Sequence, residues 1–147
     1  MKRVFVVLMS ALLIPCASPA QQAPQPTLAT TKLAAGIHVI TAEVAATPHT
    51  RMVGLMMRDR LAPNHGMVFV FEDKSQHCFW MRNTLIPLSI AFIEDDGTIV
   101  HIADMAPKSE ASTCPPRPIR YALEMDQGWF AKRGVSAGKK ISGLPPR

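Results

Sequence analysis

Two runs of β-prone residues flank an Asp-Gly pair near the middle of the chain, and no other feature constrains the fold as strongly. Leu88 to Glu94 form the first run and Thr98 to Ala103 the second, with Asp96-Gly97 between them. This order is the strongest short-range signal for a β-hairpin, because Asp and Gly tolerate the backbone conformation that a tight turn requires. We therefore predict an antiparallel hairpin here.

Further short segments have the composition or flanking residues of strands. They are Gly36 to Val44, Met67 to Phe71, Arg120 to Met125 and a last one, Lys139 to Ser142, which follows Gly138. Thr47 can cap a helix and Pro48 suits its first position, which predicts one short helix near residues 48–58 that buries Met52, Leu55 and Met56. We expect a mainly β fold, a compact antiparallel β-barrel or sandwich of short strands.

The first twenty residues have the pattern of a secretory signal. Lys2 and Arg3 precede the apolar run from Val4 to Ile14, and small residues follow up to Ala20. The apolar run is well short of the roughly 20 residues that span a bilayer. We predict a signal peptide over residues 1–20 and a periplasmic or secreted protein. A lipoprotein acylated at Cys16 is the alternative, although Pro15 is a poor residue for that processing.

The segment after the signal has the composition of a linker. It contains Pro24, Pro26 and several Gln, Ala and Thr residues without apolar periodicity. We expect a flexible tether over residues 21–35 and a single β-rich domain over residues 36–147, which is long enough to bury one core.

The charge of the chain is mildly positive. The formal charge of +5 falls to +3 once Lys2 and Arg3 leave with the signal, which carries no acid. The basic residues are scattered among Asp and Glu and form no run with interleaved aromatic residues, so nucleic acid is not expected as a partner. We expect a monomer without a transmembrane segment after signal cleavage.

Two cysteines, Cys78 and Cys114, remain in the mature chain. An even number of cysteines in an oxidising compartment indicates a disulfide, and the Cys-x-x-Cys spacing of redox proteins is absent. We predict a structural disulfide, which would tie the irregular stretch from Pro107 to Pro118 to the rest of the domain.

One segment concentrates the residue types of a binding site. Between His77 and Leu88 the chain places a tryptophan, a cysteine, an amide, a hydroxyl and a proline among apolar residues. This segment closely resembles the FWMKNT-IPL signature of the small exported bacterial proteins grouped as domain of unknown function 192. The resemblance extends over residues 37 to 144 and includes these further motifs: Arg51 to Met56, Gly66 to Phe71, Tyr121 to Met125, Gly134 and Gly138.

The resemblance implies the same single β-rich domain but no activity, because none is established for the family. It also carries the arginine, the Trp-Met pair and the Asn-Thr pair to Arg51, Trp80, Met81, Asn83 and Thr84. The family commonly has Asp after Ile-Pro-Leu, where this chain has Ser89. Acid chemistry at that position is therefore not expected.

These residues are the candidate ligand-binding site. An aromatic face beside an amide that both donates and accepts hydrogen bonds can orient a small polar ligand in an apolar pocket. The alternative is that Trp80 and Met81 belong to the core and that Asn83 and Thr84 bond the backbone before Pro87. The sequence favours a small-molecule or peptide binding module of the cell envelope, with an enzyme acting on an envelope metabolite through Arg51, Asn83 and Thr84 as the alternative.

Arg51 and Glu124 are charged residues between apolar stretches, so each is expected to need a partner. An internal ion pair between them, with Glu124 in a structural role, is one interpretation. In the other, the planar guanidinium of Arg51 holds a carboxylate or phosphate of a ligand.

Neither a cofactor nor a catalytic residue is assigned from the sequence. A soft copper site is conceivable from His65, Met67, His77, Cys78 and Met81, but the methionines have core-like spacing and Cys78 has a disulfide partner. The Gly-x-Ser-x-Gly motif of many hydrolases is absent.

Overall fold

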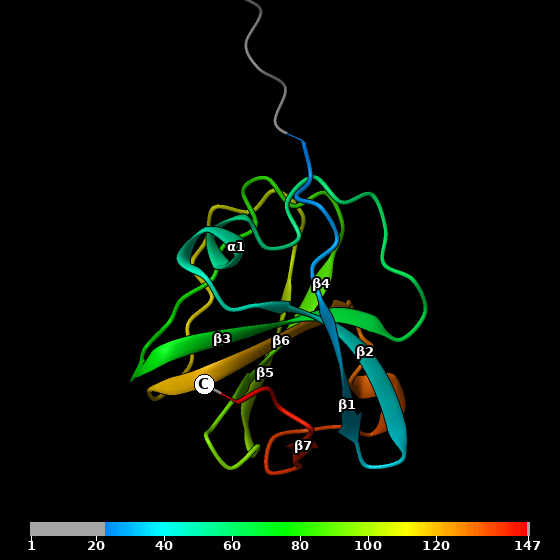
Figure 1. Cartoon of the computed structure of the whole chain (residues 1–147), viewed down its shortest axis with the longest axis vertical. Helices are drawn as coiled ribbons and strands as arrows, with labels where there is room; N and C mark the ends of the chain where they lie inside the picture. The colour runs from blue at the N-terminus through cyan, green and yellow to red at the C-terminus, as the bar shows by residue number, and fades with distance from the viewer. Residues whose placement is uncertain (1–22, 147) are drawn as a thin grey trace, which may run out of the picture.

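Seven strands form one curled sheet, a half-barrel, in the computed structural model, which describes residues 23–146 (Figure 1). The strands run in the spatial order β5-β4-β6-β3-β2-β1-β7. Their bounds are β1 Thr30–Ala35, β2 His38–Ala45, β3 His65–Ser75, β4 Leu88–Ile93, β5 Ile99–Met105, β6 Ile119–Asp126 and β7 Ile141–Ser142. The predicted mainly β fold is confirmed. The predicted signal peptide and Cys16 lie outside the described residues.

Neighbouring strands are antiparallel except for β2 and β3, which are parallel. A parallel pair needs a crossover connection, and the short helix α1, Pro48–Val53, lies in it. The predicted hairpin is confirmed as β4 and β5, where Glu94 and Thr98 bond across the Asp96-Gly97 turn.

The two ends of the sheet approach each other at this turn. Thr98 forms an isolated bridge with Lys140, and the Ile141 amide donates to the Gly97 carbonyl at 2.9 Å. Lys140 Nζ also lies 2.8 Å from the Asp96 carboxylate, and its hydrogen bond, with that of Thr98, holds the pKa of Asp96 well below its usual range. These contacts link β5 to β7 and curl the sheet.

The central strands are buried on both faces. On the first face, Val68, Leu123 and Ile93 pack with Trp129 and Phe130. On the second face, a separate cluster forms under α1 and the segment that follows β3. Its central-strand members are Met67, Phe69, Ile90, Phe92 and Ala122. Successive residues of a strand point to opposite faces, so the apolar runs of the sequence supply both cores.

Helix α1 is shorter than predicted. Thr47 caps it and accepts from the Thr50 amide, and Pro48 occupies the first turn, as expected. The helix ends at Val53 because Gly54, with φ 51°, turns the chain out of the helix. Beyond that turn Leu55 and Met56 still enter the second face, but Met52 is 65% exposed, so its predicted burial is wrong.

The prediction of a tether over residues 21–35 is wrong from Gln25 onward. Gln25 Nε2 donates to the Thr50 and Gly54 carbonyls, and the Leu28 amide donates to Glu43. Strand β1 then pairs with β2 and β7, and buries Leu33 and Ala35. A segment without its own apolar periodicity is ordered here by bonds to other elements. The domain therefore extends upstream of Gly36.

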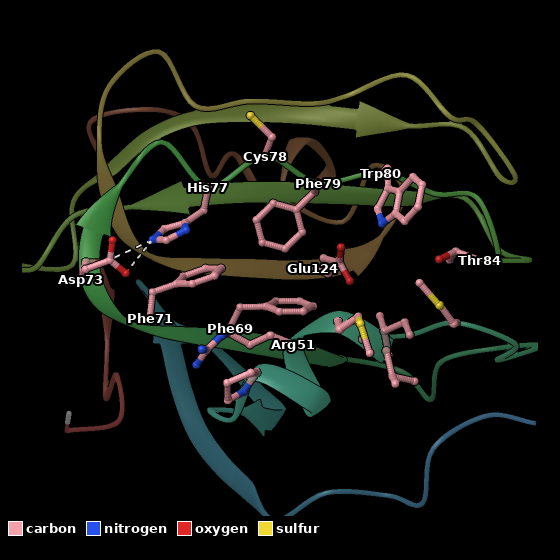
Figure 2. A pocket seen from close by; sticks show the side chains of 16 residues that line it. Arg51, Phe69, Phe71, Asp73, His77, Cys78, Phe79, Trp80, Thr84 and Glu124 are labelled. Atoms are coloured by element: carbon pink, nitrogen blue, oxygen red, sulfur yellow. Dashed lines mark hydrogen bonds and ion pairs between the residues drawn. The ribbon is translucent and has the colours of Figure 1, made fainter.

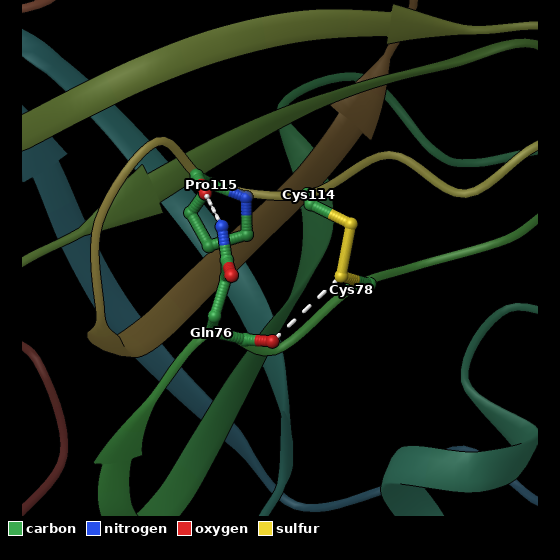
Figure 3. The surroundings of a disulfide bond; sticks show 4 residues. All are labelled: Gln76, Cys78, Cys114 and Pro115. Carbon is green, nitrogen blue, oxygen red and sulfur yellow. Dashed lines mark hydrogen bonds between the residues drawn. A yellow bond between two sulfur atoms is a disulfide. The ribbon is translucent and has the colours of Figure 1, made fainter.

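Cys78 and Cys114 form the predicted disulfide, shown in Figure 3. The bond joins the segment after β3 to the irregular stretch before β6, and the same two stretches are also held by the Phe79–Thr113 bridge and by Gln76, which donates to the Pro115 carbonyl at 2.8 Å. Among residues 23–146, no helix is both long and apolar enough to cross a membrane.

Candidate functional site

A pocket of about 430 Å³ lies on the second face of the sheet, between α1, β3 and the segment that carries the signature (Figure 2). Pockets of this size hold small organic molecules. Its apolar lining includes Phe69, Phe71, Phe79, Trp80, Leu55 and Met56, and its titratable lining residues are Arg51, Asp73, His77 and Glu124.

Glu124 projects into this pocket from the middle of the sheet. It lies on β6, opposite Met67 of β3 and Ile90 of β4, so both neighbouring strands surround it. The residue is 5% exposed, and burial raises the pKa of its carboxyl from 4.5 to about 8. Figure 2 shows the carboxyl between the Asp73–His77 end of the pocket and the Thr84 end, among the rings of Phe69, Phe79 and Trp80.

The expected ion pair between Arg51 and Glu124 does not exist. Arg51 Nη1 instead donates to the carbonyls of Ala46 at 2.6 Å and Val70 at 2.8 Å, and its guanidinium lies over the Phe71 ring. The pairing of β2 with β3 ends at Phe69, so the Val70 carbonyl lies beyond that ladder and Arg51 satisfies it. Arg51 thus anchors α1 to the sheet and lines the outer part of the pocket.

The ion pair near the pocket involves other residues. Glu43 lies opposite Met67 on β2, and Arg58 Nη2 donates to its carboxylate at 3.1 Å. Glu43 and Glu124 thus flank the same methionine, but only Glu43 is neutralised. Within the described part of the chain, no side chain or backbone group bonds the Glu124 carboxyl.

The signature divides between the pocket and its supports. Trp80 is 47% exposed and lines the pocket, with Arg82 stacked over its ring, and Thr84 is buried and lines the pocket as well. Met81 is 2% exposed and belongs to the core under β4. Asn83 lies outside the pocket, where its amide nitrogen contacts Met56 Sδ at 3.9 Å.

Of the five predicted binding residues, the structure therefore brings Arg51, Trp80 and Thr84 together at one pocket and places Met81 and Asn83 outside its lining. Period-two alternation turns Met81 into the core where Trp80 is exposed, whereas Phe79 packs against the core and also lines the pocket. The Thr84 hydroxyl, like the Glu124 carboxyl, has no hydrogen-bond partner among residues 23–146. Both groups face the pocket and are not sealed from it, so a molecule that occupies the pocket can satisfy them.

The other end of the pocket is framed by a smaller polar cluster. The His77 ring stacks on Phe71 with centroids 3.6 Å apart, and its Nε2 lies 3.7 Å from the Asp73 carboxylate. His77 Nε2 also contacts the Asp73 carbonyl at 3.2 Å. Asp73 and His77 therefore satisfy each other.

The pocket can bind and can exchange a proton, but its donor set does not favour a metal. Among residues 23–146, no three His, Cys, Asp or Glu side chains are grouped closely enough to hold an ion. A lone carboxyl with a pKa near 8 can take up or release a proton at neutral pH.

The sequence indicated a structural role for Glu124, and its local pattern did not distinguish the aromatic walls from core residues. The run from Tyr121 to Met125 predicted a buried strand, and one acid in such a run is itself a signal for a site. Its position opposite the signature depends on the pairing of β6 with β3 and β4, which no local pattern encodes.

Comparisons with known proteins agree with the fold. A protein from Sinorhizobium meliloti 1021, whose description proposes a transcription regulator, is 38% identical with a TM-score of 0.76, over 81% of this chain and 97% of that one. A protein of unknown function from Novosphingobium aromaticivorans DSM 12444 is 32% identical with a TM-score of 0.74, over 86% of this chain and 94% of that one. No curated protein matches significantly. The model of the family DUF192, described as "Uncharacterized ACR", matches residues 29–143, and the chain therefore belongs to this family.

Proposed function

We propose that the protein is an exported binding module for a small organic molecule, which occupies the pocket between α1 and the signature segment. The observation that carries the proposal is the unpartnered Glu124 carboxyl, buried among aromatic rings in a cavity of about 430 Å³. A folded protein keeps such a group at a cost in stability, and a ligand that bonds it removes this cost.

The surroundings of the carboxyl support the same proposal. The Thr84 hydroxyl supplies a second group without a protein partner, and Phe69, Phe79 and Trp80 supply apolar area. Binding pockets generally combine a mostly apolar lining with a few convergent polar groups. The signal-like N-terminus and the disulfide support export.

Mass spectrometry of small molecules carried through purification tests the proposal. The native protein is isolated from a periplasmic extract, denatured, and the released compounds are identified. We expect one compound, or one class of compounds, at a stoichiometric level.

Two alanine variants locate the retained compound. Trp80→Ala removes an aromatic wall of the pocket, whereas Leu85→Ala removes an exposed apolar side chain of the same segment that does not line it. Trp80→Ala should lose the compound and Leu85→Ala should keep it. Native protein that carries no compound from any extract, or equal loss in both variants, would contradict the proposal.

A second candidate function is a proton-transfer enzyme, which the pKa of about 8 at Glu124 favours. A carboxyl with a pKa near the working pH is suited to general acid–base catalysis, and a lone carboxyl in an apolar pocket has no other evident chemistry to offer. This candidate requires a bound molecule with an acidic C–H group near Glu124.

Deuterium exchange distinguishes the enzyme from the binding module. The wild type and Glu124→Gln are incubated with the small-molecule extract in D₂O, and deuterium incorporation is followed by mass spectrometry. Incorporation by the wild type alone, with a rate that rises through a pKa near 8, would identify an enzyme. Retention of a compound without deuterium exchange would support the binding module over the enzyme.

A further inference from the structure

We propose that the ligand is an organic ammonium cation, whose charge pairs with the Glu124 carboxylate while its apolar part lies against the aromatic rings of the pocket. This inference rests on the proposed binding function and names the chemical class of the ligand.

The charges of the pocket leave one site for a cation. Four titratable side chains line it, from α1 (Arg51), β3 (Asp73), the signature segment (His77) and β6 (Glu124). Arg51 donates to two backbone carbonyls, and Asp73 lies beside His77. Glu43 on β2, on the far side of β3 from Glu124, is paired with Arg58. Arg51 also has no carboxylate partner, but two carbonyls and the Phe71 ring hold its guanidinium, whereas no described protein group bonds the Glu124 carboxyl. A positive ligand group is therefore the complement of Glu124 that the described residues do not supply.

The walls favour a cation over a neutral group. The rings of Phe69, Phe79 and Trp80 surround the carboxyl, and the negative potential of an aromatic face attracts an ammonium group. The Arg51 guanidinium already occupies such a position, 5.2 Å from the centroid of the Phe71 ring. A carboxylate ligand could lie beside Glu124 only while that carboxyl stays protonated, whereas an ammonium group pairs with its ionised form.

Proton release follows from this pairing. Without a ligand the carboxyl is mostly protonated at pH 7, because its pKa is raised to about 8. A cation next to it favours the ionised form, so binding lowers this pKa and expels the proton. A permanently charged ligand should therefore release about one proton per molecule bound at pH 7, and none when the protein is already ionised.

Calorimetry with two probes tests the inference on the intact mature protein. Benzyltrimethylammonium has a pH-independent charge, so any proton released at pH 7, measured from buffers of different ionisation enthalpy, comes from the protein. We expect about one proton, and an affinity that rises about tenfold per pH unit up to pH 8 and levels off above it. Phenylethylamine should bind at least about tenfold more tightly at pH 8 than phenylethanol, which has a hydroxyl in place of the ammonium group.

Matched variants assign the effect to one carboxyl. Glu124→Gln should weaken benzyltrimethylammonium binding at pH 8 by at least about thirtyfold and abolish proton release. Glu110→Gln, which removes the same charge from an exposed residue outside the pocket, should change neither. The proton count is measured on the wild type, so the inference stays testable if Glu124→Gln folds poorly.

Several outcomes overturn the ammonium assignment. They are equal binding of phenylethylamine and phenylethanol, tighter binding of phenylacetate than of either, binding without proton release at pH 7, and no binding of any cationic probe. None of these outcomes bears on the retained compound that tests the binding function itself. A neutral or anionic compound retained by the wild type and lost in Trp80→Ala would refute the ammonium class and leave the binding module standing.

Discussion

Glu124 is the residue whose position is hardest to explain by packing. It occupies a central strand, 5% exposed, where an apolar side chain would complete the second face at no electrostatic cost. Burial raises its pKa from 4.5 to about 8, so the folded protein holds a proton that the unfolded chain has already released over this range of pH. The free energy of unfolding must therefore fall as the pH rises through this window.

The variant Glu124→Gln should remove this pH dependence. In the wild type, the protonated Glu124 carboxyl contributes to the free energy of unfolding. This contribution is fully present below pH 4.5 and is lost by about pH 8, at no more than about 1.4 kcal/mol per pH unit. The amide does not ionise, so the variant should gain roughly 3 to 5 kcal/mol relative to the wild type between pH 5 and pH 9. Urea unfolding at pH 5, 7 and 9 measures the difference, with Glu110→Gln as the control. Parallel profiles for the wild type and Glu124→Gln would mean that the carboxyl is solvated in the folded state.

Glu43 shows how the same fold treats an acid that has a structural partner. Arg58 and the Leu28 amide both donate to its carboxylate, and both side chains of the ion pair are largely buried. Glu43→Gln or Arg58→Met alone leaves a buried charge and should cost on the order of 3 kcal/mol. The double variant should cost less than the sum, which a double-mutant cycle by urea unfolding measures. Strict additivity would show that the pair contributes nothing.

Elements with local signals were predictable, and those defined by distant contacts were not. The β4–β5 hairpin, the buried β3 and the cap of α1 each follow from a few adjacent residues. Strand β1 was missed because only Leu33 and Ala35 are buried in it and its neighbours read as a linker. The end of α1 was placed too late, although Gly54 was available as a stop signal.

The site was predictable to a similar extent. The signature identified Trp80 and Thr84, since an aromatic residue and a hydroxyl among apolar residues mark a site candidate. Alternation along the segment separates Met81, which is buried, from Trp80, which is exposed, but Asn83 lies in the turn that follows, where alternation does not assign its side. Placing Glu124 at the site required knowledge of the sheet register.

Asn83 should behave as a support of the pocket rather than as a ligand contact. Its amide makes only a long contact to Met56 Sδ, and its backbone carbonyl, which accepts from the Met57 amide, is unaffected by substitution. Asn83→Ala should therefore cost less than about 1 kcal/mol and leave the retained compound in place. Thr84→Val, at a pocket position, should reduce retention. Loss of the compound in Asn83→Ala at unchanged stability would place Asn83 at the ligand.

The disulfide fixes the signature segment against the stretch before β6. The two cysteines are 36 residues apart, and closing a loop of this length restricts the unfolded chain by about 4 kcal/mol on the loop-entropy estimate. Cys78→Ser and Cys114→Ser should lower the melting temperature equally, and the double variant should be no worse than either. Two free thiols titrated in the native, unreduced protein would contradict the bond.

At the scale of the whole molecule, the two faces of the sheet are covered in different ways, and the pocket lies on the second face. The first face is closed by contacts between its ends, where the β4–β5 turn meets β7. The second face is covered by α1 and by irregular segments, and the pocket lies under them. Loops on a rigid sheet commonly carry binding residues, because their sequences can vary while the sheet holds their ends in place. The N-terminal segment connects the two regions, because it contacts α1 and then enters the sheet as β1.

Truncation from the N-terminus should therefore have two separate effects. A chain that starts at Thr30 loses the hydrogen bonds of Gln25 and Leu28 but keeps β1, so it should fold and be destabilised by roughly 1 to 3 kcal/mol. A chain that starts at Gly36 also loses β1, which leaves β7 without its partner and removes Leu33 from the first-face core. It should show no cooperative unfolding transition in urea, whereas a control chain that starts at Ala23 should show one. A cooperative transition at the control's urea midpoint for the chain that starts at Gly36 would show that β1 adds nothing to the folded unit.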